Sequence, residues 1–215
     1  MVNHSYFAVE AHPAQEQELR EYFSFFVPGY KFMPAFKSRH WDGKVKLYNM
    51  VSKQMNVGLY THLRRFCADR FYQLEILEHE VYGIPSFKED IDHPALIDFL
   101  SVLDVPFKPR DYQYKAIAHG VENRRCLLLS PTGSGKSFII YNLLRYCYEV
   151  TEGKILVIVP TTSLVEQMYK DFSDYGYDVD EFCHKIYSGK EKVTDKRVII
   201  STWQSIYKFG KEWFE

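Results

Sequence analysis

One short run of small residues around a lysine carries the clearest chemistry in this sequence. Residues 131–137 read PTGSGKS; they follow the apolar run Leu127–Leu129 and precede Phe138–Tyr148, which has the composition of a helix. Glycines allow backbone N–H groups to close around an anion, and the start of a helix adds the positive end of its dipole. This order predicts a phosphate-binding loop, with Ser130 standing where the general pattern has its first glycine.

Two side chains of this loop are expected to act on a nucleoside triphosphate. Lys136 would reach the β- and γ-phosphates as a catalytic residue, and the hydroxyl of Ser137 would complete the shell of a Mg²⁺ ion. A flexible turn with a solvated lysine is the alternative. The agreement of strand, spacing and helix argues against that alternative.

A glutamine upstream of the loop adds a group that can read a base. Gln113 stands in a short segment that begins at Arg110. Its amide can donate and accept a hydrogen bond at once, which matches the edge of adenine. ATP and Mg²⁺ are therefore the predicted cofactors. The residues expected to hold the nucleotide are Arg110, Gln113, Pro131, Thr132, Gly133, Ser134, Gly135, Lys136 and Ser137.

Threonines follow two other apolar runs in this half of the chain. Thr161 and Thr162 come after Ile155–Val159, and Thr202 comes after Arg197–Ser201. Hydroxyls and free N–H groups at the end of a strand, where a helix starts, suit a DNA phosphate. A helix cap explains Thr161 equally well, so both interpretations stand at this point.

The N-terminal half contains a segment, Tyr30–Tyr48, in which cations alternate with aromatic rings. Such a mixture suits DNA, because phosphates meet Lys and Arg while rings stack on bases or wedge at a junction. The rings could instead form the core of a small domain, with the lysines on a solvated face. Asp42-Gly43 predicts a hairpin turn before a half-buried strand. The predicted DNA contacts here are Lys37, Arg39, Trp41, Lys44 and Lys46.

The remaining N-terminal elements are predicted from the spacing of apolar residues and from the stretches that interrupt it. Tyr6–Val9 reads as a strand, and Ala14–Phe23 as an amphipathic helix with Glu16 on its polar side. Leu59–Phe71 reads as a helix, and Tyr72–Tyr82 as a closing strand. The polar stretch Gly83–His93 predicts a domain boundary.

The C-terminal half predicts a parallel sheet. The three apolar runs, Cys126–Leu129, Ile155–Val159 and Arg197–Ser201, read as strands buried on both faces, connected by helices Lys136–Tyr148 and Ser163–Phe172. The expected fold of residues 91–215 is therefore α/β with a P-loop, and it is preceded by a small α+β domain, residues 1–90.

The composition of the chain excludes several classes of protein and site. The 215 residues are 46% hydrophobic and 26% charged, as in globular proteins, and the formal net charge of −1 confines any nucleic-acid surface to a local patch. The four cysteines are scattered, which favours idle thiols over a metal site or disulfides. With neither a signal peptide nor an apolar run of membrane length, the expected location is the cytoplasm.

The order of these motifs resembles the first half of a superfamily-2 helicase motor domain. The matching segments are Arg110–Gln113 (Q motif), Pro131–Ser137 (motif I), Pro160–Gln167 (motif Ia) and Ser201–Gln204 (the next DNA-contacting motif). Phe32–Phe36 and Trp41–Leu47 resemble the accessory domain of UvsW-type bacteriophage repair and recombination helicases. The resemblance implies that residues 91–215 form an incomplete P-loop NTPase with a RecA-like parallel sheet and that residues 1–90 form an accessory domain. It further implies an ATP-driven motor on branched DNA, including forks, Holliday junctions and R-loops, with the small domain helping to select the substrate.

One departure from this family sets a further expectation. Its Asp-Glu-x-His motif II should follow soon after Trp213-Phe214, whereas this sequence stops at Glu215, and the second RecA-like domain is likewise not in it. We therefore expect the N-terminal part of a helicase whose own ATPase activity is near background and whose partner is a downstream polypeptide. The alternatives are a non-catalytic module that binds ATP and DNA, and a small kinase, against which Gln113 and the extra N-terminal domain argue.

Overall fold

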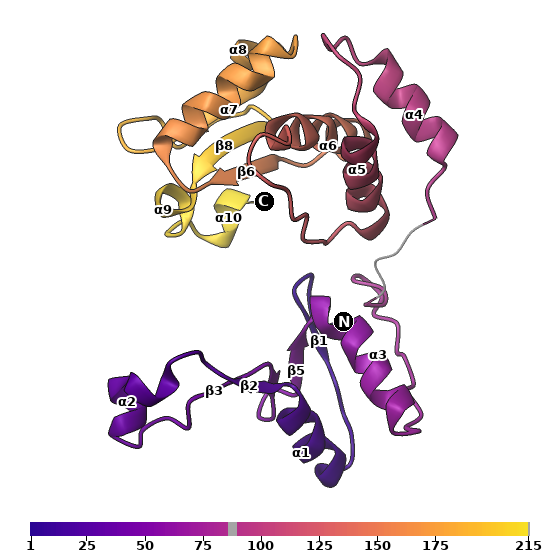
Figure 1. Cartoon of the computed structure of the whole chain (residues 1–215), viewed down its shortest axis with the longest axis vertical. Coiled ribbons are helices and arrows are strands. Elements are labelled where there is room, and N and C mark those ends of the chain that lie inside the picture. The colour runs from indigo at the N-terminus through magenta and orange to yellow at the C-terminus, as the bar shows by residue number, and fades with distance from the viewer. Residues whose placement is uncertain (86–89, 215) are drawn as a thin grey trace. The chain divides into compact units, whose positions relative to one another are not determined.

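The chain divides into two compact units. The structure, a computed structural model, describes residues 1–85 and 90–214, and its units are Met1–Ser86 and Phe87–Glu215 (Figure 1). Residues 86–89 of the predicted boundary segment lie outside the described residues. In the described part, no helix has the length and apolarity that crossing a membrane requires.

The first unit is built on a small antiparallel sheet. Its strand order is β1 (Tyr6–Ala8), β5 (Gln54–Asn56), β4 (Tyr48–Asn49), and Met55 is the register partner of both Phe7 and Tyr48. Helices α1 (Pro13–Tyr22) and α3 (Tyr60–Asp69) accompany this sheet, and a short 3₁₀ turn, η2 (Val57–Leu59), leads into α3. The buried apolar side chains of this unit are Phe7, Leu19, Phe23, Tyr48, Met55, Val57, Tyr60, Leu63, Phe66 and Cys67.

A second antiparallel pair in this unit carries the basic and aromatic segment. Strands β2 (Ser24–Phe26) and β3 (Lys44–Lys46) pair, and the connection between them holds η1 (Tyr30–Phe32) and α2 (Pro34–Lys37). Figure 1 shows α2 at the far end of this pair, which we call the arm (residues 24–47). The predicted tight hairpin at Asp42-Gly43 is therefore wrong, because the two strands are joined by a long, partly helical connection.

The predictions for the rest of this unit have mixed outcomes. The first strand and both helices are confirmed as β1, α1 and α3. The strand predicted over Tyr72–Tyr82 is wrong: these residues form no regular strand, and only an isolated bridge joins His79 to Gly83. The placement of Glu16 on a polar face is also wrong. Glu16 is 5% exposed and forms an ion pair with Lys53.

The Glu16–Lys53 pair predicts a pH-dependent contribution to the stability of the first unit. The hydrogen bond from Lys53 holds the pKa of the Glu16 carboxyl below its usual value of 4.5. A depressed pKa stabilises the fold above the unfolded-state value, and this contribution is lost as pH falls through the folded-state value. Glu16→Gln is expected to lower stability in urea unfolding at pH 7, and the difference from wild type should shrink below about pH 4.5. The exposed Glu10→Gln is the control. A deficit for Glu16→Gln that did not decrease as the pH was lowered below about 4.5 would contradict the expectation.

The second unit contains a parallel sheet with strand order β6 (Ile155–Val159), β8 (Val198–Thr202), β7 (Cys183–Ile186). All five residues of the central strand β8 are buried. Helices α6 (Lys136–Val150), α7 (Thr162–Asp174) and α8 (Val179–Phe182) contribute to the main core. The fully or nearly fully buried members of that core include Phe138, Tyr141, Leu144, Val165, Phe172, Val198 and Ile200.

Two further clusters complete this unit. Helices α4 (His93–Val102) and α5 (Asp111–Asn123) bury Leu96, Leu100 and Ile117 against Ile139 of α6. The short helices α9 (Trp203–Ile206) and α10 (Lys211–Phe214) follow β8. There Ile186, Ile199 and Ile206 form a third cluster.

One strand prediction in this unit is wrong, and one strand was not predicted. Ile155–Val159 and the run ending at Ser201 are confirmed as β6 and β8, but Cys126–Leu129 pairs with no strand among the described residues, and Leu127 and Leu129 are 80% and 88% exposed. An apolar run favours burial of its side chains. A strand also needs a neighbouring strand that hydrogen-bonds to its N–H and C=O groups. The strand β7 was missed because its polar residues interrupt the apolar run.

Candidate functional site

The loop between Ser130 and Ser137 has a backbone that requires glycine. Gly133 and Gly135 adopt φ values of +81° and +76°, a left-handed conformation that other residues rarely take. A Cβ at Gly135 would also lie 2.5 Å from Nε2 of Gln113. Gly135 is thus needed twice, for its own conformation and for the close approach of the glutamine.

The loop presents a cation and several free donors at the start of α6. Nζ of Lys136 donates to the carbonyl oxygens of Pro131 (2.8 Å) and Ser130 (3.2 Å). Among the described residues, the N–H groups of Gly133, Gly135, Lys136 and Ser137 have no acceptor. Unpaired amides at a helix start attract anions, so this donor set fits a phosphate group.

Gln113 ties the start of α5 to the loop. Its Oε1 accepts a hydrogen bond from the N–H of Arg110 (2.9 Å), and its Nε2 donates to the carbonyl of Ser134 (3.1 Å). The side chain is 6% exposed, whereas Arg110 is exposed. The hydroxyl of Tyr112 donates to the same carbonyl (3.1 Å), a contact that sequence reasoning missed although Tyr112 adjoins Gln113. An amide retains one further hydrogen bond at each end, so the glutamine keeps capacity for a ligand.

Ser137 has a neighbour that the sequence did not suggest. Its Oγ lies 3.0 Å from the hydroxyl of Tyr175, at the C-terminal cap of α7. The Tyr175 ring packs edge-on to Phe138 and at a tilt to Tyr141, with centroid distances of 5.2 and 5.3 Å. Burial raises the pKa of the Tyr175 phenol above its usual value of 10. No local pattern links positions so far apart in the sequence.

The threonines lie together at one edge of the parallel sheet. The register partners Val159 and Thr202 end β6 and β8, so Thr161 and Thr162 follow at the same edge as Thr202. Thr161 and Thr162 are exposed, and Oγ1 of Thr161 accepts from the N–H of Leu164 (3.3 Å), as a helix cap does. Thr202 departs from the expectation of a surface contact: it is 5% exposed, and its hydroxyl is bonded to that of Ser205 (2.9 Å).

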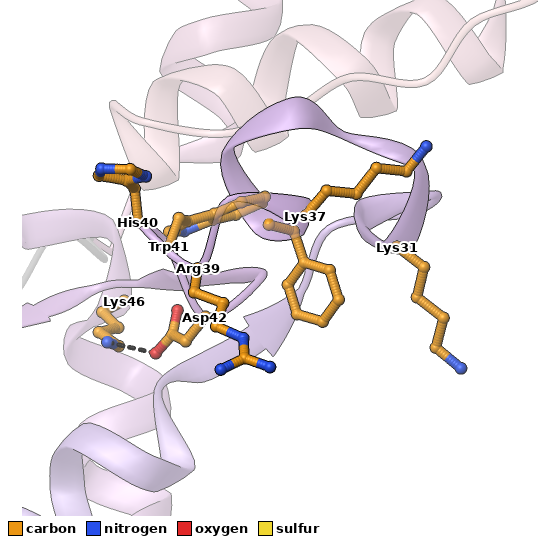
Figure 2. Close-up of a pocket in the computed structure, with 8 residues that line it drawn as sticks. Lys31, Lys37, Arg39, His40, Trp41, Asp42 and Lys46 are labelled. Atoms are coloured by element: carbon orange, nitrogen blue, oxygen red, sulfur yellow. Dashed lines mark ion pairs between the residues drawn. The ribbon is translucent and has the colours of Figure 1, made fainter.

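A basic pocket opens at the tip of the arm (Figure 2). Its volume is about 610 Å³. The residues that line it are Lys31, Phe36, Lys37, Arg39, His40, Trp41, Asp42 and Lys46. Figure 2 shows Lys46 paired with Asp42, at an N–O distance of 2.5 Å. Four of the five residues predicted to contact DNA in this segment therefore share one pocket, and Lys44 lies beside it with its Nζ 4.9 Å from the centroid of the Phe26 ring.

The aromatic rings of the segment divide between two roles. Tyr48 is 1% exposed and belongs to the core, whereas Phe32 is 80% exposed. Trp41 is half-buried, and its Nε1 donates to the carbonyl of Lys44 (2.8 Å). The core interpretation is thus correct for Tyr48, whereas DNA contact by the exposed part of the segment stays a prediction.

Two family models match the chain, one in each half. The model described as "DNA helicase UvsW, N-terminal" matches residues 1–77, and the model described as "Type III restriction enzyme, res subunit" matches residues 106–213. Together they cover the arm, the phosphate-binding type of loop and the parallel sheet.

Curated relatives and solved structures agree with these matches. The chain is 35% identical to "ATP-dependent DNA helicase uvsW" of Enterobacteria phage T4, over 98% of this chain and 42% of the relative. It is 22% identical to "DNA 3'-5' translocase XPB2" of Sulfurisphaera tokodaii, over 89% of this chain and 36% of that protein. The chain thus spans about two fifths of the length of these relatives.

Two crystal structures of the T4 protein superpose on nearly the whole chain. "Crystal structure of the UvsW helicase from Bacteriophage T4" matches with a TM-score of 0.85 at 34% identity, covering 99% of this chain and 76% of that one. "The crystal structure of T4 UvsW" matches with a TM-score of 0.86, covering 98% and 43%. The predicted fold class, a small α+β unit followed by an incomplete RecA-like α/β unit, is confirmed. The chain belongs to the UvsW-type helicase family and corresponds to its N-terminal part.

Proposed function

We propose that this chain is the nucleotide- and DNA-binding N-terminal part of an ATP-dependent helicase that acts on branched DNA, including RNA–DNA hybrids, in phage repair, recombination and replication. The observation that carries the proposal is the loop at the start of α6. There Lys136 and a set of unpaired amides lie next to Gln113. The proposed location is the cytoplasm of an infected bacterial cell.

ATP would be held by this loop, with the phosphates on the amides of residues 133–137 and on Lys136. Gln113 and Arg110 would recognise the adenine. Mg²⁺ would be held by the Ser137 hydroxyl together with the phosphates themselves, since the described residues contain no cluster of three or more His, Cys, Asp or Glu side chains suited to a metal. The metal, when bound, neutralises phosphate charge in phosphoryl transfer.

DNA would contact the chain at two places. Exposed Thr161 and Thr162 offer hydroxyls at the edge of the parallel sheet, suited to the sugar–phosphate backbone. In the first unit, the arm offers Lys37, Arg39 and Trp41 at its pocket. A contact to the sugar–phosphate backbone in one unit and a separate contact in the other unit would together suit a branched substrate, which presents more than one DNA segment at once.

Hydrolysis would require parts beyond these residues. The strands β6, β7 and β8 are followed by Pro160, Tyr187 and Trp203, so none of the three carries an acidic pair at its carboxyl end to hold Mg²⁺ and orient water. An arginine supplied across the cleft adds a further ~10³–10⁵ in rate in related phosphoryl-transfer enzymes. The same observation favours the second candidate, a module that binds ATP and DNA without hydrolysis.

The choice of branched DNA is tested by fluorescence anisotropy. A labelled three-way fork and a linear duplex of equal length are titrated with the chain at a fixed salt concentration, because phosphate contacts make every affinity salt-dependent. We expect the fork to bind at least fivefold more tightly. Equal affinities would contradict the preference for branched DNA while leaving DNA binding itself intact.

The contact between Ser137 and Tyr175 gives a prediction about metal-dependent nucleotide binding. The Tyr175 hydroxyl engages the Ser137 oxygen that Mg²⁺ would use, so Tyr175→Phe removes a competitor. A hydrogen bond contributes about 0.5–1.5 kcal/mol, which corresponds to a two- to tenfold tighter binding of Mg–ATP. Calorimetric titration with a slowly hydrolysed ATP analogue, with and without Mg²⁺, measures the effect.

Tyr177→Phe is the matched control for this variant. Tyr177 lies two positions away and is buried in the same core, but its hydroxyl has no hydrogen-bond partner among the described residues. Its removal should leave nucleotide affinity unchanged. Weaker Mg–ATP binding by Tyr175→Phe alone would show instead that the tyrosine positions Ser137 for the metal.

A further inference from the structure

The pocket at the tip of the arm has the composition of a site for one unstacked nucleotide, an inference that rests on the proposed DNA-binding function. Its volume of about 610 Å³ lies within the ~300–1,000 Å³ of typical small-molecule pockets. Cationic side chains and aromatic rings line it together. Phosphate and base are the two parts of a nucleotide that these groups recognise.

The charge of the pocket is strongly positive. Lys31, Lys37 and Arg39 form no ion pair with an acidic side chain among the described residues, and Figure 2 shows Lys31 and Lys37 extended into the open. The one carboxylate in the lining, Asp42, is paired with Lys46 and accepts a hydrogen bond from the N–H of Lys44 (3.1 Å). A bound phosphate therefore meets cations whose charge is not already neutralised.

The aromatic wall of the pocket is fixed before any ligand binds. The Trp41 indole is anchored by its hydrogen bond to the carbonyl of Lys44. Phe36 packs edge-on against Tyr30 (4.8 Å), which stacks on Phe26 (4.6 Å). Gly43 permits this packing, because a Cβ there would lie 2.3 Å from the Tyr30 ring. A ring held in place loses little freedom when a base stacks on it.

Arg39 occupies a backbone position that favours glycine. The N–H groups of Arg39 and His40 bond to the carbonyls of Phe36 and Ala35 (both 3.0 Å), which closes helix α2 with a Schellman motif. Arg39 is the left-handed residue of that motif, with φ +60°. A glycine at position 39 would therefore keep this backbone and remove only the side chain with its guanidinium.

From this geometry we propose that the pocket binds a single unstacked nucleotide of single-stranded DNA. Lys37 and Arg39 hold its phosphate, and its base lies on Trp41. A duplex keeps its bases stacked and hides their faces, whereas a single strand at a fork offers them. The pocket therefore recognises the single-stranded part of a branched substrate.

The full chain carrying Trp203→Phe and Trp213→Phe provides the test, because Trp41 is then the sole tryptophan. Its fluorescence is followed during titration with oligo(dT) and with a duplex of equal length. We expect quenching by oligo(dT) and little by the duplex. Quenching by the duplex at equal or lower concentration would overturn the proposal in favour of a backbone groove.

Substitutions separate a role in binding from a role in folding. Arg39→Gly should weaken oligo(dT) binding and reduce the dependence of log K on log salt by about 0.7, the amount for one phosphate contact on a single strand, while the melting temperature stays equal or rises. Trp41→Leu should weaken the binding of labelled oligo(dT), measured by anisotropy, at least fivefold, because it removes the ring on which one base stacks. Unchanged affinity in both variants would overturn the proposal.

Phe71→Gly is the control for Arg39→Gly. Phe71 is the left-handed residue of the equivalent motif after α3, with φ +57°, and is 96% exposed away from the pocket lining. Its replacement should leave oligo(dT) binding unchanged. If the pocket variants bind oligo(dT) as the wild type does while the wild-type chain still binds the fork, only the pocket proposal is contradicted. A folded chain that binds no DNA of any kind would contradict the proposed function itself.

Discussion

Replacing Lys136 by alanine will weaken nucleotide binding about a hundredfold while DNA binding by the first unit persists. The ammonium group of Lys136 is held by the carbonyls of the loop that it closes, and it is the charge expected to meet the β- and γ-phosphates. Truncation removes a charge-assisted contact, which is stronger than a neutral one. Titration with a fluorescent ATP analogue, alongside anisotropy with forked DNA, measures both effects on one preparation.

The matched control for this variant is Lys154→Ala. Lys154 is an exposed lysine of the same unit, just before β6, and its loss should leave nucleotide affinity unchanged. Equal loss of nucleotide and DNA binding by a folded Lys136→Ala protein would contradict the division of roles between the two units.

Replacing Phe172 by alanine will lower the stability of the second unit by about 3–5 kcal/mol, as large-to-small changes at a buried phenylalanine do. Phe172 is fully buried on α7 and packs against Tyr141 with a ring distance of 5.5 Å. Helix α7 also carries Thr161 at its start and Tyr175 at its end. Loosening this helix should therefore also weaken the contact between the Tyr175 and Ser137 hydroxyls.

Urea unfolding with one reporter in each unit measures this effect. Trp41 reports on the first unit, and Trp203 on the second, in variants that retain one tryptophan each. We expect Phe172→Ala to shift only the Trp203 transition. Phe32→Ala, which truncates an 80% exposed ring, is the control and should change stability by less than about 0.5 kcal/mol. A shift of the Trp41 transition by Phe172→Ala would show that the units do not unfold independently.

The parts of this fold that local chemistry specifies were predictable. The glycines at 133 and 135 are needed for left-handed backbone, and Lys136 begins a helix whose buried face is mostly apolar, so loop and helix follow from adjacent residues. The buried strand β8 was equally visible, because all its residues are apolar or small. In such segments every local preference agrees with the final structure.

The errors arose where distant partners decide the outcome. Cys126–Leu129 has the composition of a buried strand, yet it forms none without a neighbour among the described residues. Glu16 was assigned to a polar face from periodicity alone, but Lys53, far along the sequence, pairs with it. Gly43 does adopt a left-handed turn conformation, with φ +80°. That turn ends a long connection between β2 and β3 and does not form a tight hairpin.

The candidate site shows the same division. The composition of the loop predicted a set of phosphate-binding residues, and the structure brings them together with Gln113 through the carbonyl of Ser134. The neighbours Tyr112 and Tyr175 were not predicted, because a tyrosine that bonds to one loop oxygen leaves no pattern in sequence. The buried position of Thr202 could not be foreseen either, since it depends on the strands on both sides of β8.

The central claim, that this chain supplies the nucleotide and DNA sites of a helicase but not the whole hydrolytic centre, is tested most directly by its ATPase activity. The rate is measured for the 215 residues alone, with forked DNA, and with forked DNA plus a polypeptide that carries the remaining motor motifs of a UvsW-type helicase. We expect a background rate in the first two cases and DNA-stimulated hydrolysis in the third. Sustained hydrolysis by the 215 residues alone would contradict the claim, because it would place a complete catalytic centre within them.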